Sequence, residues 1–399
     1  MKVSNRVSNI SPSLTLAITA KAKKMKSDGL DVASFGAGEP DFNTPAYIIE
    51  AAKVALDKGM TKYTPSSGTL ELRKAICAHL KSSQNLDYTP AQIVVSNGGK
   101  QALRNTMEAL LEPGDEVILP SPYWLTYPEL IKLSGGIPVY IGGDSNNDFK
   151  ITPAQLEKAI TKKTKAIVFN SPSNPTGTVY TEDEIKAIAL VCDKADIYII
   201  SDEIYEKLVY DGAEHYSVAR VSQSVYDKTV ICSGLSKTYS MTGWRIGYTA
   251  SPLEVAKAID ALQSHTTSNA NSIAQYAATA ALSSAKGEEF LSELTCSFDR
   301  RRRLMIKMIS ETNGFTCNSP KGAFYVMMNV NSALGKSYNG KKINDVSDFC
   351  DILLEEKLVA VVSGDSFGAP DFVRLSYATS DEEIKKGLSR IIEFSSEIK

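Results

Sequence analysis

The stretch CSGLSKTYSMTGWRIGY, Cys232 to Tyr248, places one lysine and one arginine among glycines, hydroxyl residues and apolar residues. It begins inside an apolar, β-rich run, Thr229 to Ser233, so Lys237 follows the end of a predicted strand. A lysine in neutral surroundings can serve as a reactive amine, although a surface position explains most single lysines. The segments that follow the other predicted strands help to decide between these interpretations.

Similar apolar runs precede this stretch and alternate with helical patterns, such as Gln101 to Leu111 and Glu182 to Lys194. The alternation predicts βαβ units and a mainly parallel sheet that is covered by helices on both faces. The predicted strands are Gln92 to Asn97, Glu116 to Pro120, Lys165 to Asn170, Ile197 to Asp202 and Thr229 to Ser233.

Each predicted strand leads into a polar loop, and ligands of such sheets bind at the carboxyl ends of the strands. Turn chemistry alone accounts poorly for five loops of this kind, so we expect their side chains to form one site. The loops are NGGK from Asn97, SPYW from Ser121, NSPSNPTG from Asn170, DEIY from Asp202 and the quoted stretch itself.

Composition favours a small-molecule ligand. The 399 residues exceed what one hydrophobic core usually organises, and the net charge of -2 gives no reason to expect nucleic acid or a membrane surface as a partner. Six scattered cysteines without a CxxC pair argue against zinc and disulfides and favour the cytoplasm. The three histidines lie apart, so we expect surface or packing positions and no metal site. No segment approaches the ~20 apolar residues of a membrane span.

The C-terminal part of the chain has a different order of predicted elements: a long helix, several short strands and a final helix. This order predicts a second, α+β domain. We expect residues 45–283 to form a large domain, and residues 1–44 and 284–399 to form a smaller one.

Two features indicate a phosphate site. In NGGKQ, Gly98 and Gly99 allow a phosphate to approach the backbone at a helix N-terminus. This evidence is weak alone, because glycines in strand-to-helix turns are common for steric reasons, and the motif matches neither GxxxxGK[ST] nor GxGxxG. Arg245 supplies a guanidinium suited to the same anion.

Two further residues indicate what carries the phosphate. The amine of Lys237 can form an imine with an aldehyde. Asp202 could hold a heterocyclic nitrogen protonated, or could simply cap a helix. An aldehyde, a pyridine nitrogen and a phosphate together describe pyridoxal 5'-phosphate, PLP.

These motifs resemble, in order and over nearly the whole chain, those of the class I, fold-type-I PLP-dependent aminotransferases, especially the bacterial-type aspartate aminotransferase subgroup. The resemblance implies an α/β large domain with a mainly parallel seven-stranded sheet between helices, and a smaller α+β domain that closes over the active site. The motifs are AGEPDF from Ala37, YTPSSG from Tyr63, SPYW from Ser121, NPTG from Asn174, DEIY from Asp202, GLSKTYSMTGWRIG from Gly234 and RLSY from Arg374.

The resemblance also implies catalytic and ring-binding roles. Lys237 would bind the cofactor as an imine and later move a proton between substrate and cofactor. Asp202 would pair with the pyridinium nitrogen. Asn174 and Tyr205 would hydrogen-bond the 3'-oxygen of the ring. Trp124 would stack on its face, although a loop tryptophan often only packs.

At the phosphate end, the resemblance implies contacts from Gly99, Lys100, Ser236 and Arg245, the first two through backbone amides. Tyr63 matches a tyrosine that reaches the phosphate of the partner subunit, which implies a homodimer with shared sites. In isolation Tyr63 would be interpreted as a turn residue. The segment from Thr266 to Asn269 is also expected near the dimer interface.

At the substrate end, Arg374 matches the arginine that grips the α-carboxylate; otherwise it would be interpreted as an edge-strand charge. Gly38 would add a backbone contact, with Trp124 and Asn174 beside the substrate. The stretch Glu39–Pro40 is expected to belong to a segment that closes when substrate binds.

Two positions depart from relatives of this family. Gly234 stands where some relatives carry a hydroxyl, which leaves the phosphate ligands open between Ser233 and Ser236. Ser11 stands where several carry a basic residue for the distal carboxylate of the substrate, so Lys100 and Thr15 become the candidates for that contact.

The expected function is ping-pong transfer of an amino group from an L-amino acid, aspartate first, to 2-oxoglutarate. Aromatic or broad specificity and a PLP-dependent β-lyase remain alternatives. A non-catalytic PLP sensor is less favoured, because the chain has no basic patch.

Overall fold

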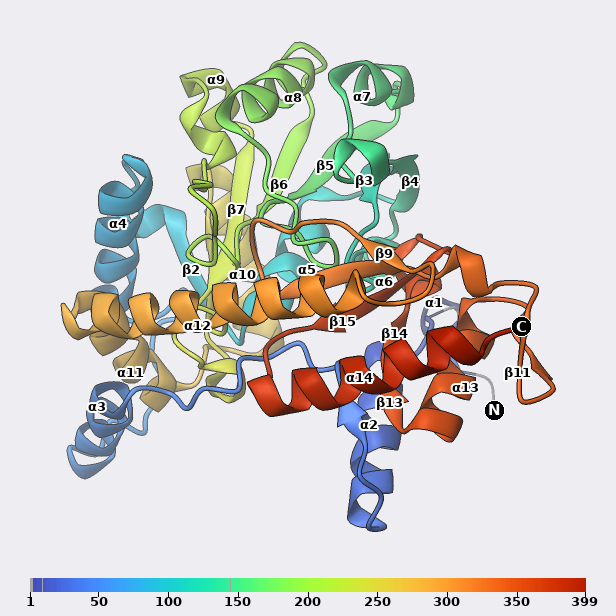
Figure 1. Ribbon diagram of the computed structural model, residues 1–399. Coiled ribbons are helices and arrows are strands. Elements are labelled where there is room, and N and C mark those ends of the chain that lie inside the picture. Colours follow the sequence, from blue (N-terminus) through green and yellow to red (C-terminus); the bar gives the residue numbers. More distant parts are fainter. Residues whose placement is uncertain (1–2, 9, 144) are drawn as a thin grey trace.

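The computed structural model describes residues 3–8, 10–143 and 145–399, with a seven-stranded and a four-stranded β-sheet flanked by helices, and two further two-stranded sheets (Figure 1). The larger sheet has seven strands in the order β2-β8-β7-β6-β5-β3-β4. All neighbours in it are parallel except β8, which runs antiparallel to β2 and β7, so the mainly parallel seven-stranded sheet is confirmed. The strands are β2 (Ile93–Ser96), β3 (Glu116–Ser121), β4 (Ile137–Gly142), β5 (Thr164–Asn170), β6 (Tyr198–Asp202), β7 (Thr229–Gly234) and β8 (Gly247–Ala250).

All five predicted strands are present, and their carboxyl ends lie at one edge because the five share a direction. The sequence analysis missed β4 and β8. The edge strand β4 carries Pro138 and exposed residues, and β8 is only four residues long and starts inside the turn that follows Lys237.

Helices cover both faces of this sheet. Val168 and Ile200 pack in one core cluster with α5 and α10, whereas Ile167 and Ile199 pack in another with α8. Neighbouring residues of a strand therefore serve opposite faces, as expected of a buried parallel sheet. The covering helices are α5 (Gly99–Leu110), α6 (Thr126–Leu133), α7 (Pro153–Ala159), α8 (Glu182–Lys194), α9 (Gln223–Tyr226) and α10 (Leu253–Thr266).

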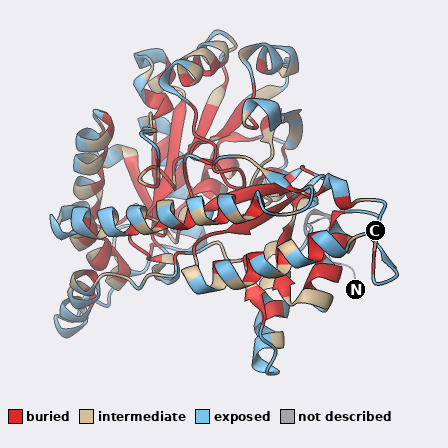
Figure 2. Cartoon of the chain, in the orientation of Figure 1, coloured by how far each residue is buried: buried red, intermediate tan, exposed pale blue. Residues whose placement is uncertain are grey.

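The smaller sheet is antiparallel, in the order β14-β15-β10-β9. Its strands β10, β14 and β15 are mostly buried, whereas the short strand β9 is not, and α12 and α14 turn their exposed faces away from the sheet (Figure 2). The elements are β9 (Thr316–Cys317), β10 (Tyr325–Asn329), β14 (Val362–Ser363), β15 (Phe372–Ser376), α12 (Lys286–Ile309), α13 (Val346–Lys357) and α14 (Asp381–Glu397).

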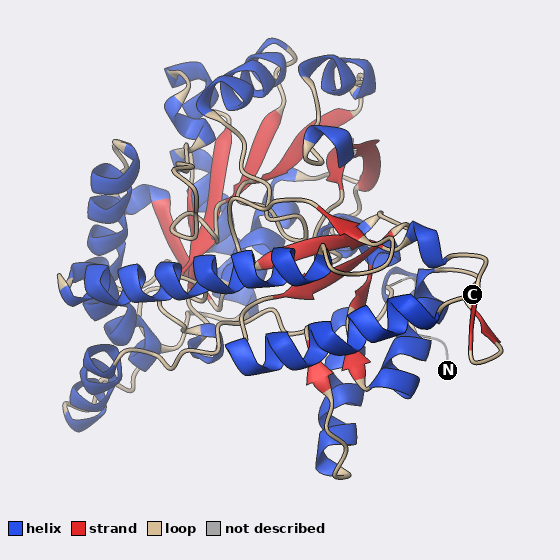
Figure 3. Ribbon diagram, viewed as in Figure 1, coloured by secondary structure: helices blue, strands red, loops and turns tan. Residues whose placement is uncertain are grey.

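The N-terminal segment joins this part of the molecule, because β1 (Ala33–Ser34) pairs in parallel with β13 (Val359–Ala360). Figure 3 shows this short pair of strands below α14. The other elements are α1 (Asn5–Ser8), α2 (Leu14–Ser27), α3 (Ala46–Asp57), α4 (Leu70–Gln84), α11 (Ser272–Ser283), β11 (Ser337–Tyr338) and β12 (Lys341–Lys342). None of the helices within the described residues is long and apolar enough to cross a membrane.

Candidate active site

A pocket of about 330 Å³ lies at the carboxyl edge of the large sheet, where the smaller sheet meets it. Apart from Gly98 and Tyr63, every residue that the sequence analysis placed in the site lines this pocket, and so do the alternative candidates Ser233 and Thr15. Those residues are Gly38, Gly99, Lys100, Trp124, Asn174, Asp202, Tyr205, Ser236, Lys237, Arg245 and Arg374. Tyr63 is 90% exposed and Ser11 is exposed, and neither lines the pocket.

Lys237 lies three residues beyond the end of β7 and donates a hydrogen bond from Nζ to the carbonyl oxygen of Gly38. Burial lowers the pKa of Lys237 to about 8, against the raising effect of Glu39 and together with the charges of Arg245 and Arg374. Near neutral pH a larger fraction of this amine than of a solvated lysine is therefore uncharged, and so nucleophilic.

Asp202 is the last residue of β6 and is buried. One carboxylate oxygen accepts a hydrogen bond from the Tyr127 hydroxyl at 2.7 Å, and the other accepts one from the backbone N–H of Ile204 at 3.2 Å. Burial raises the pKa of Asp202 to about 6, although both hydrogen bonds lower it. A buried carboxylate with this limited support is suited to pairing with a cationic ligand group.

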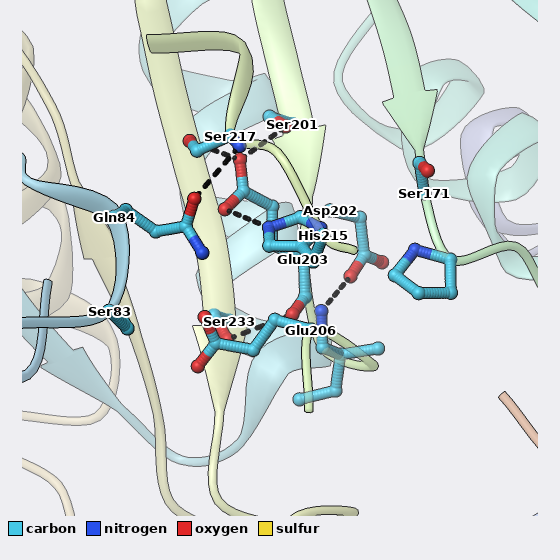
Figure 4. Close-up of polar contacts among 12 residues, drawn as sticks. Ser83, Gln84, Ser171, Ser201, Asp202, Glu203, Glu206, His215, Ser217 and Ser233 are labelled. Carbon is cyan, nitrogen blue, oxygen red and sulfur yellow. Dashed lines mark hydrogen bonds and ion pairs between the residues drawn. The ribbon is translucent and has the colours of Figure 1, made fainter. Parts of the chain in front are cut away.

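Glu203, the next residue, points away from Asp202 into a second polar cluster (Figure 4). Its carboxylate lies 3.0 Å from His215 Nε2 and accepts hydrogen bonds from Ser201 and Ser217, both at 2.8 Å. Three residues on, Glu206 lies 2.5 Å from His79 Nε2. Against the effect of burial, the charge of His79 lowers the pKa of Glu206 to about 2.

These pairs hold both ends of the turn that carries Tyr205. They also correct the sequence-based expectation that the histidines serve only as surface or packing residues. His79 and His215 are the partners of buried carboxylates, and the spacing of 127 residues between His79 and Glu206 hides that pairing in the sequence.

The glycines near the start of α5 are required by close packing. A Cβ on Gly98, whose φ is +88°, would lie 2.3 Å from Nη2 of Arg245, and one on Gly247 would lie 2.3 Å from the backbone nitrogen of Gly99. The N-terminus of α5 and the Arg245 guanidinium are thereby brought together. Because helix N-termini and guanidinium groups both favour anions, this end of the pocket suits a phosphate.

Arg374 occupies the middle of β15 and is 1% exposed. It donates to Asn174 Oδ1 at 2.9 Å and to the Gly36 carbonyl at 3.2 Å, while its buried Nε has no hydrogen-bond partner among the described residues. Burial lowers its pKa. A buried guanidinium with an unused donor is a ready receptor for a carboxylate.

Two contacts among tyrosine and tryptophan side chains complete the walls of the pocket. Tyr205 and Tyr325 share a hydrogen bond of 2.9 Å between their hydroxyls, and the ring of Trp124 packs edge-on against Tyr127 with centroids 5.4 Å apart. The sequence analysis missed Tyr325 and Tyr127. Both lie within ordinary strand and helix patterns, where a tyrosine is indistinguishable from a core residue.

The family model for aminotransferase class I and II matches residues 31–391. The chain belongs to this family. It is 51% identical over 394 residues to the aspartate aminotransferase of Bacillus subtilis (strain 168), with 99% of each chain covered. It is 48% identical over 394 residues to the aspartate/prephenate aminotransferase of Cereibacter sphaeroides, with 98% of each covered. The crystal structure of the aspartate aminotransferase from Rhizobium meliloti matches all of both chains at 41% identity and a TM-score of 0.96.

Aminotransferases of class I depend on PLP, and this class I/II aminotransferase is a PLP-dependent enzyme of fold type I. The pocket fits the cofactor in three independent respects. It offers a buried amine of lowered pKa, a buried carboxylate suited to a cationic partner, and a glycine-lined helix N-terminus next to a guanidinium. An aldehyde, a protonated pyridine nitrogen and a phosphate would meet these groups respectively.

Proposed function

We propose that this aminotransferase moves the amino group of L-aspartate to 2-oxoglutarate by a ping-pong mechanism. The observation that carries the proposal is the arrangement of cations in the pocket. Arg374 offers an unpartnered buried donor for one carboxylate, and Lys100 adds a second cation whose Nζ lies 5.0 Å from the ring centroid of Trp124. A dicarboxylic amino acid has the two anionic groups that such a pair would bind. The relatives named as aspartate aminotransferases support the same choice.

We propose the following roles on the reactive side. Bound PLP supplies an electron sink that stabilises negative charge at the substrate Cα. Lys237 holds the cofactor and then moves the proton at that carbon. Asp202 accepts the hydrogen bond of the pyridinium N–H. Asn174 and Tyr205 hydrogen-bond the ring oxygen. Trp124 packs on the face of the cofactor ring, and the contact with Tyr127 holds the Trp124 side chain in place.

At the phosphate end we propose that the backbone amides of Gly99 and Lys100, the hydroxyl of Ser236 and the guanidinium of Arg245 bind the cofactor. At the substrate end, Arg374 binds the α-carboxylate. In the structure the Gly38 carbonyl accepts the Lys237 N–H, so the contact of Gly38 with the catalytic amine supports its position beside the substrate.

We propose that residues 45–283 and residues 1–44 with 284–399 act as two domains that close over the site. The segment after Gly38 spans both. Glu39 accepts a hydrogen bond from Thr242 at 2.8 Å, and Asp41 makes two contacts with Arg301 of α12, at 2.8 and 2.9 Å. These contacts would fasten the segment once it lies over the substrate.

We also propose a cytoplasmic homodimer with shared active sites. Tyr63, far from its own pocket, follows a helix, α3, on which apolar residues such as Val54 and Leu56 are exposed. A second copy would cover these residues and could receive Tyr63 at its phosphate site. The cytoplasmic location is supported by the free state of all six cysteines.

Mixing two defective variants tests the shared sites. Tyr63→Ala should bind PLP weakly and Lys237→Ala should lack activity. In a mixed dimer, the site on the Tyr63→Ala chain would contain Lys237 and would receive an intact tyrosine from its partner. We therefore expect refolded mixtures to regain activity that neither variant shows alone. Activity equal to the sum of the separate variants would contradict the sharing of sites.

The lowered pKa of Lys237 predicts how cofactor capture depends on pH. Only the uncharged amine attacks an aldehyde, so we expect the rate at which the apoenzyme captures PLP to rise with pH and to level off above about pH 8. If Lys237 were solvated, the rate of PLP capture would keep rising up to about pH 10. Stopped-flow absorption measures the rate. Because Glu39 raises the pKa of Lys237, the Glu39→Gln control should reach its plateau at lower pH.

A half-reaction tests the proposed function. The PLP-loaded enzyme is mixed with L-aspartate alone, and we expect one equivalent of oxaloacetate per site with no ammonia. A β-lyase would leave L-aspartate unconverted, because Cβ of aspartate carries no leaving group. It would instead release ammonia and pyruvate from an amino acid that has one, such as an S-alkyl-L-cysteine, so that result would indicate a β-lyase. The same assay with L-phenylalanine and L-tyrosine separates aspartate preference from aromatic or broad specificity, since a faster reaction with either would overturn the preference for aspartate.

A further inference from the structure

Tyr127, on the first turn of α6, connects two parts of the pocket. Its ring supports the edge of Trp124, and its hydroxyl donates to the inner carboxylate oxygen of Asp202 at 2.7 Å. The side chain is 2% exposed, so water does not compete for this hydrogen bond. Within the described residues, the only other donor to the Asp202 carboxylate is the Ile204 backbone N–H, at the longer distance of 3.2 Å.

The charge of Asp202 depends on this donor. A buried carboxylate loses hydration, and hydrogen bonds to its ionised form are what offset that loss. The nearby charges offset the lost hydration only in part, because their effects on Asp202 oppose each other. Lys237 favours the ionised carboxylate, and Glu203 disfavours it. The titratable groups that face Asp202 or the Tyr127 hydroxyl are Tyr127, Glu203, Tyr205, Cys232 and Lys237.

We propose that Tyr127 is a positioning residue whose hydroxyl keeps Asp202 ionised and oriented toward the ring nitrogen of the cofactor. The inference rests on the proposed role of Asp202. It assigns to Tyr127 control over the strength of the ion pair that would keep the ring protonated. A tyrosine that only filled space behind Trp124 would leave that ion pair unchanged when its hydroxyl was removed.

The test compares Tyr127→Phe with the unaltered apoenzyme, because phenylalanine keeps the ring and removes only the hydroxyl. PLP affinity is measured by titration between about pH 5 and pH 9. Loss of a hydrogen bond to a charged group should weaken PLP binding about 10- to 100-fold near neutral pH. The same loss should move the pH below which affinity declines upward by about one unit or more, because Asp202 then takes up its proton at higher pH.

A cofactor analogue with carbon in place of the ring nitrogen provides the specific control. It cannot donate to Asp202, so it should bind to Tyr127→Phe no more weakly than to the unaltered enzyme. The matched variant is Tyr180→Phe, which removes another buried tyrosine hydroxyl, 2.9 Å from the Ile151 backbone nitrogen and outside this pocket. It should leave the pH profile unchanged.

Asp202→Asn separates this inference from the proposed function. If Asp202→Asn removes the pH dependence and Tyr127→Phe adds no further loss in that background, Tyr127 acts through Asp202. If Asp202→Asn weakens PLP but Tyr127→Phe shifts neither affinity nor pH profile, only the inference is wrong. If Asp202→Asn itself has no effect on PLP binding, the proposed role of Asp202 is wrong.

Should Tyr127→Phe fail to fold, 3,5-difluorotyrosine at position 127 serves instead. It keeps the shape of the side chain and is a stronger hydrogen-bond donor. The pH profile should then move to lower pH, opposite to the shift expected for phenylalanine. An unchanged profile would overturn the inference.

Discussion

Lys237→Ala should lower kcat/KM for L-aspartate by more than about 10⁴-fold, because in the proposed mechanism one residue supplies both the nucleophile that holds the cofactor and the base that moves the substrate proton. The structure supports both tasks, since the Lys237 amine is buried, has a pKa of about 8 and lies in the same pocket as Asp202 and Arg374. Steady-state assays with L-aspartate and 2-oxoglutarate measure the loss.

The variant should still bind PLP without covalent attachment, because the phosphate end of the pocket does not depend on the amine. Retained binding with lost turnover would show that the substitution removes chemistry and leaves the fold intact. Lys257→Ala is the matched control, since Lys257 is an exposed lysine of α10 that pairs with Glu254. Turnover by Lys237→Ala at the level of this control would refute the proposed mechanism.

Arg374→Gln should lower kcat/KM for L-aspartate by about 100-fold or more, mainly through KM, because truncating one member of a buried charge pair costs that much binding. The guanidinium is 1% exposed, and its Nε has no hydrogen-bond partner in the part of the chain that the structure describes, so water cannot replace it. Glutamine can keep the contact with Asn174 but supplies neither the charge nor the planar pair of donors.

PLP affinity should change little in Arg374→Gln, since the proposed phosphate ligands lie on other elements. A simple primary amine, which has no carboxylate, should react equally slowly with the variant and the unaltered enzyme. If the variant lost activity toward that amine as well, Arg374 would be needed for the chemical step and not for recognition of the carboxylate.

The sequence allowed much of this site to be predicted, for a physical reason. The strand β6, which ends at Asp202, and the strand β7, which ends three residues before Lys237, have apolar, β-branched centres, and the residues at and after their ends belong to motifs whose chemistry is local. Parallel strands then bring those ends to one edge, so the pocket follows from strand order. Arg374 was predicted only through family resemblance, since an arginine within a strand gives no local sign that its side chain faces a pocket.

The missed features depend on contacts between distant residues. Tyr127 is important because its hydroxyl meets Asp202, 75 residues away, and His79 because it meets Glu206. No periodicity or turn signal encodes such a pairing. The short strand β8 was missed for another reason, since its four residues lie in a segment dominated by glycine and polar residues.

The pairing of β1 with β13 has a consequence for how the protein is made. Ala33 meets Val359 in the sheet, so β1 receives its partner only after the chain has been synthesised through Val359. The large sheet, from Ile93 to Ala250, is complete in sequence long before that point. Arg374, and Arg301 that pairs with Asp41, likewise follow the large sheet in the sequence and are synthesised after it. During synthesis the part of the pocket that we propose to bind the cofactor can therefore assemble before Arg374, the proposed ligand of the substrate carboxylate, has been added to the chain.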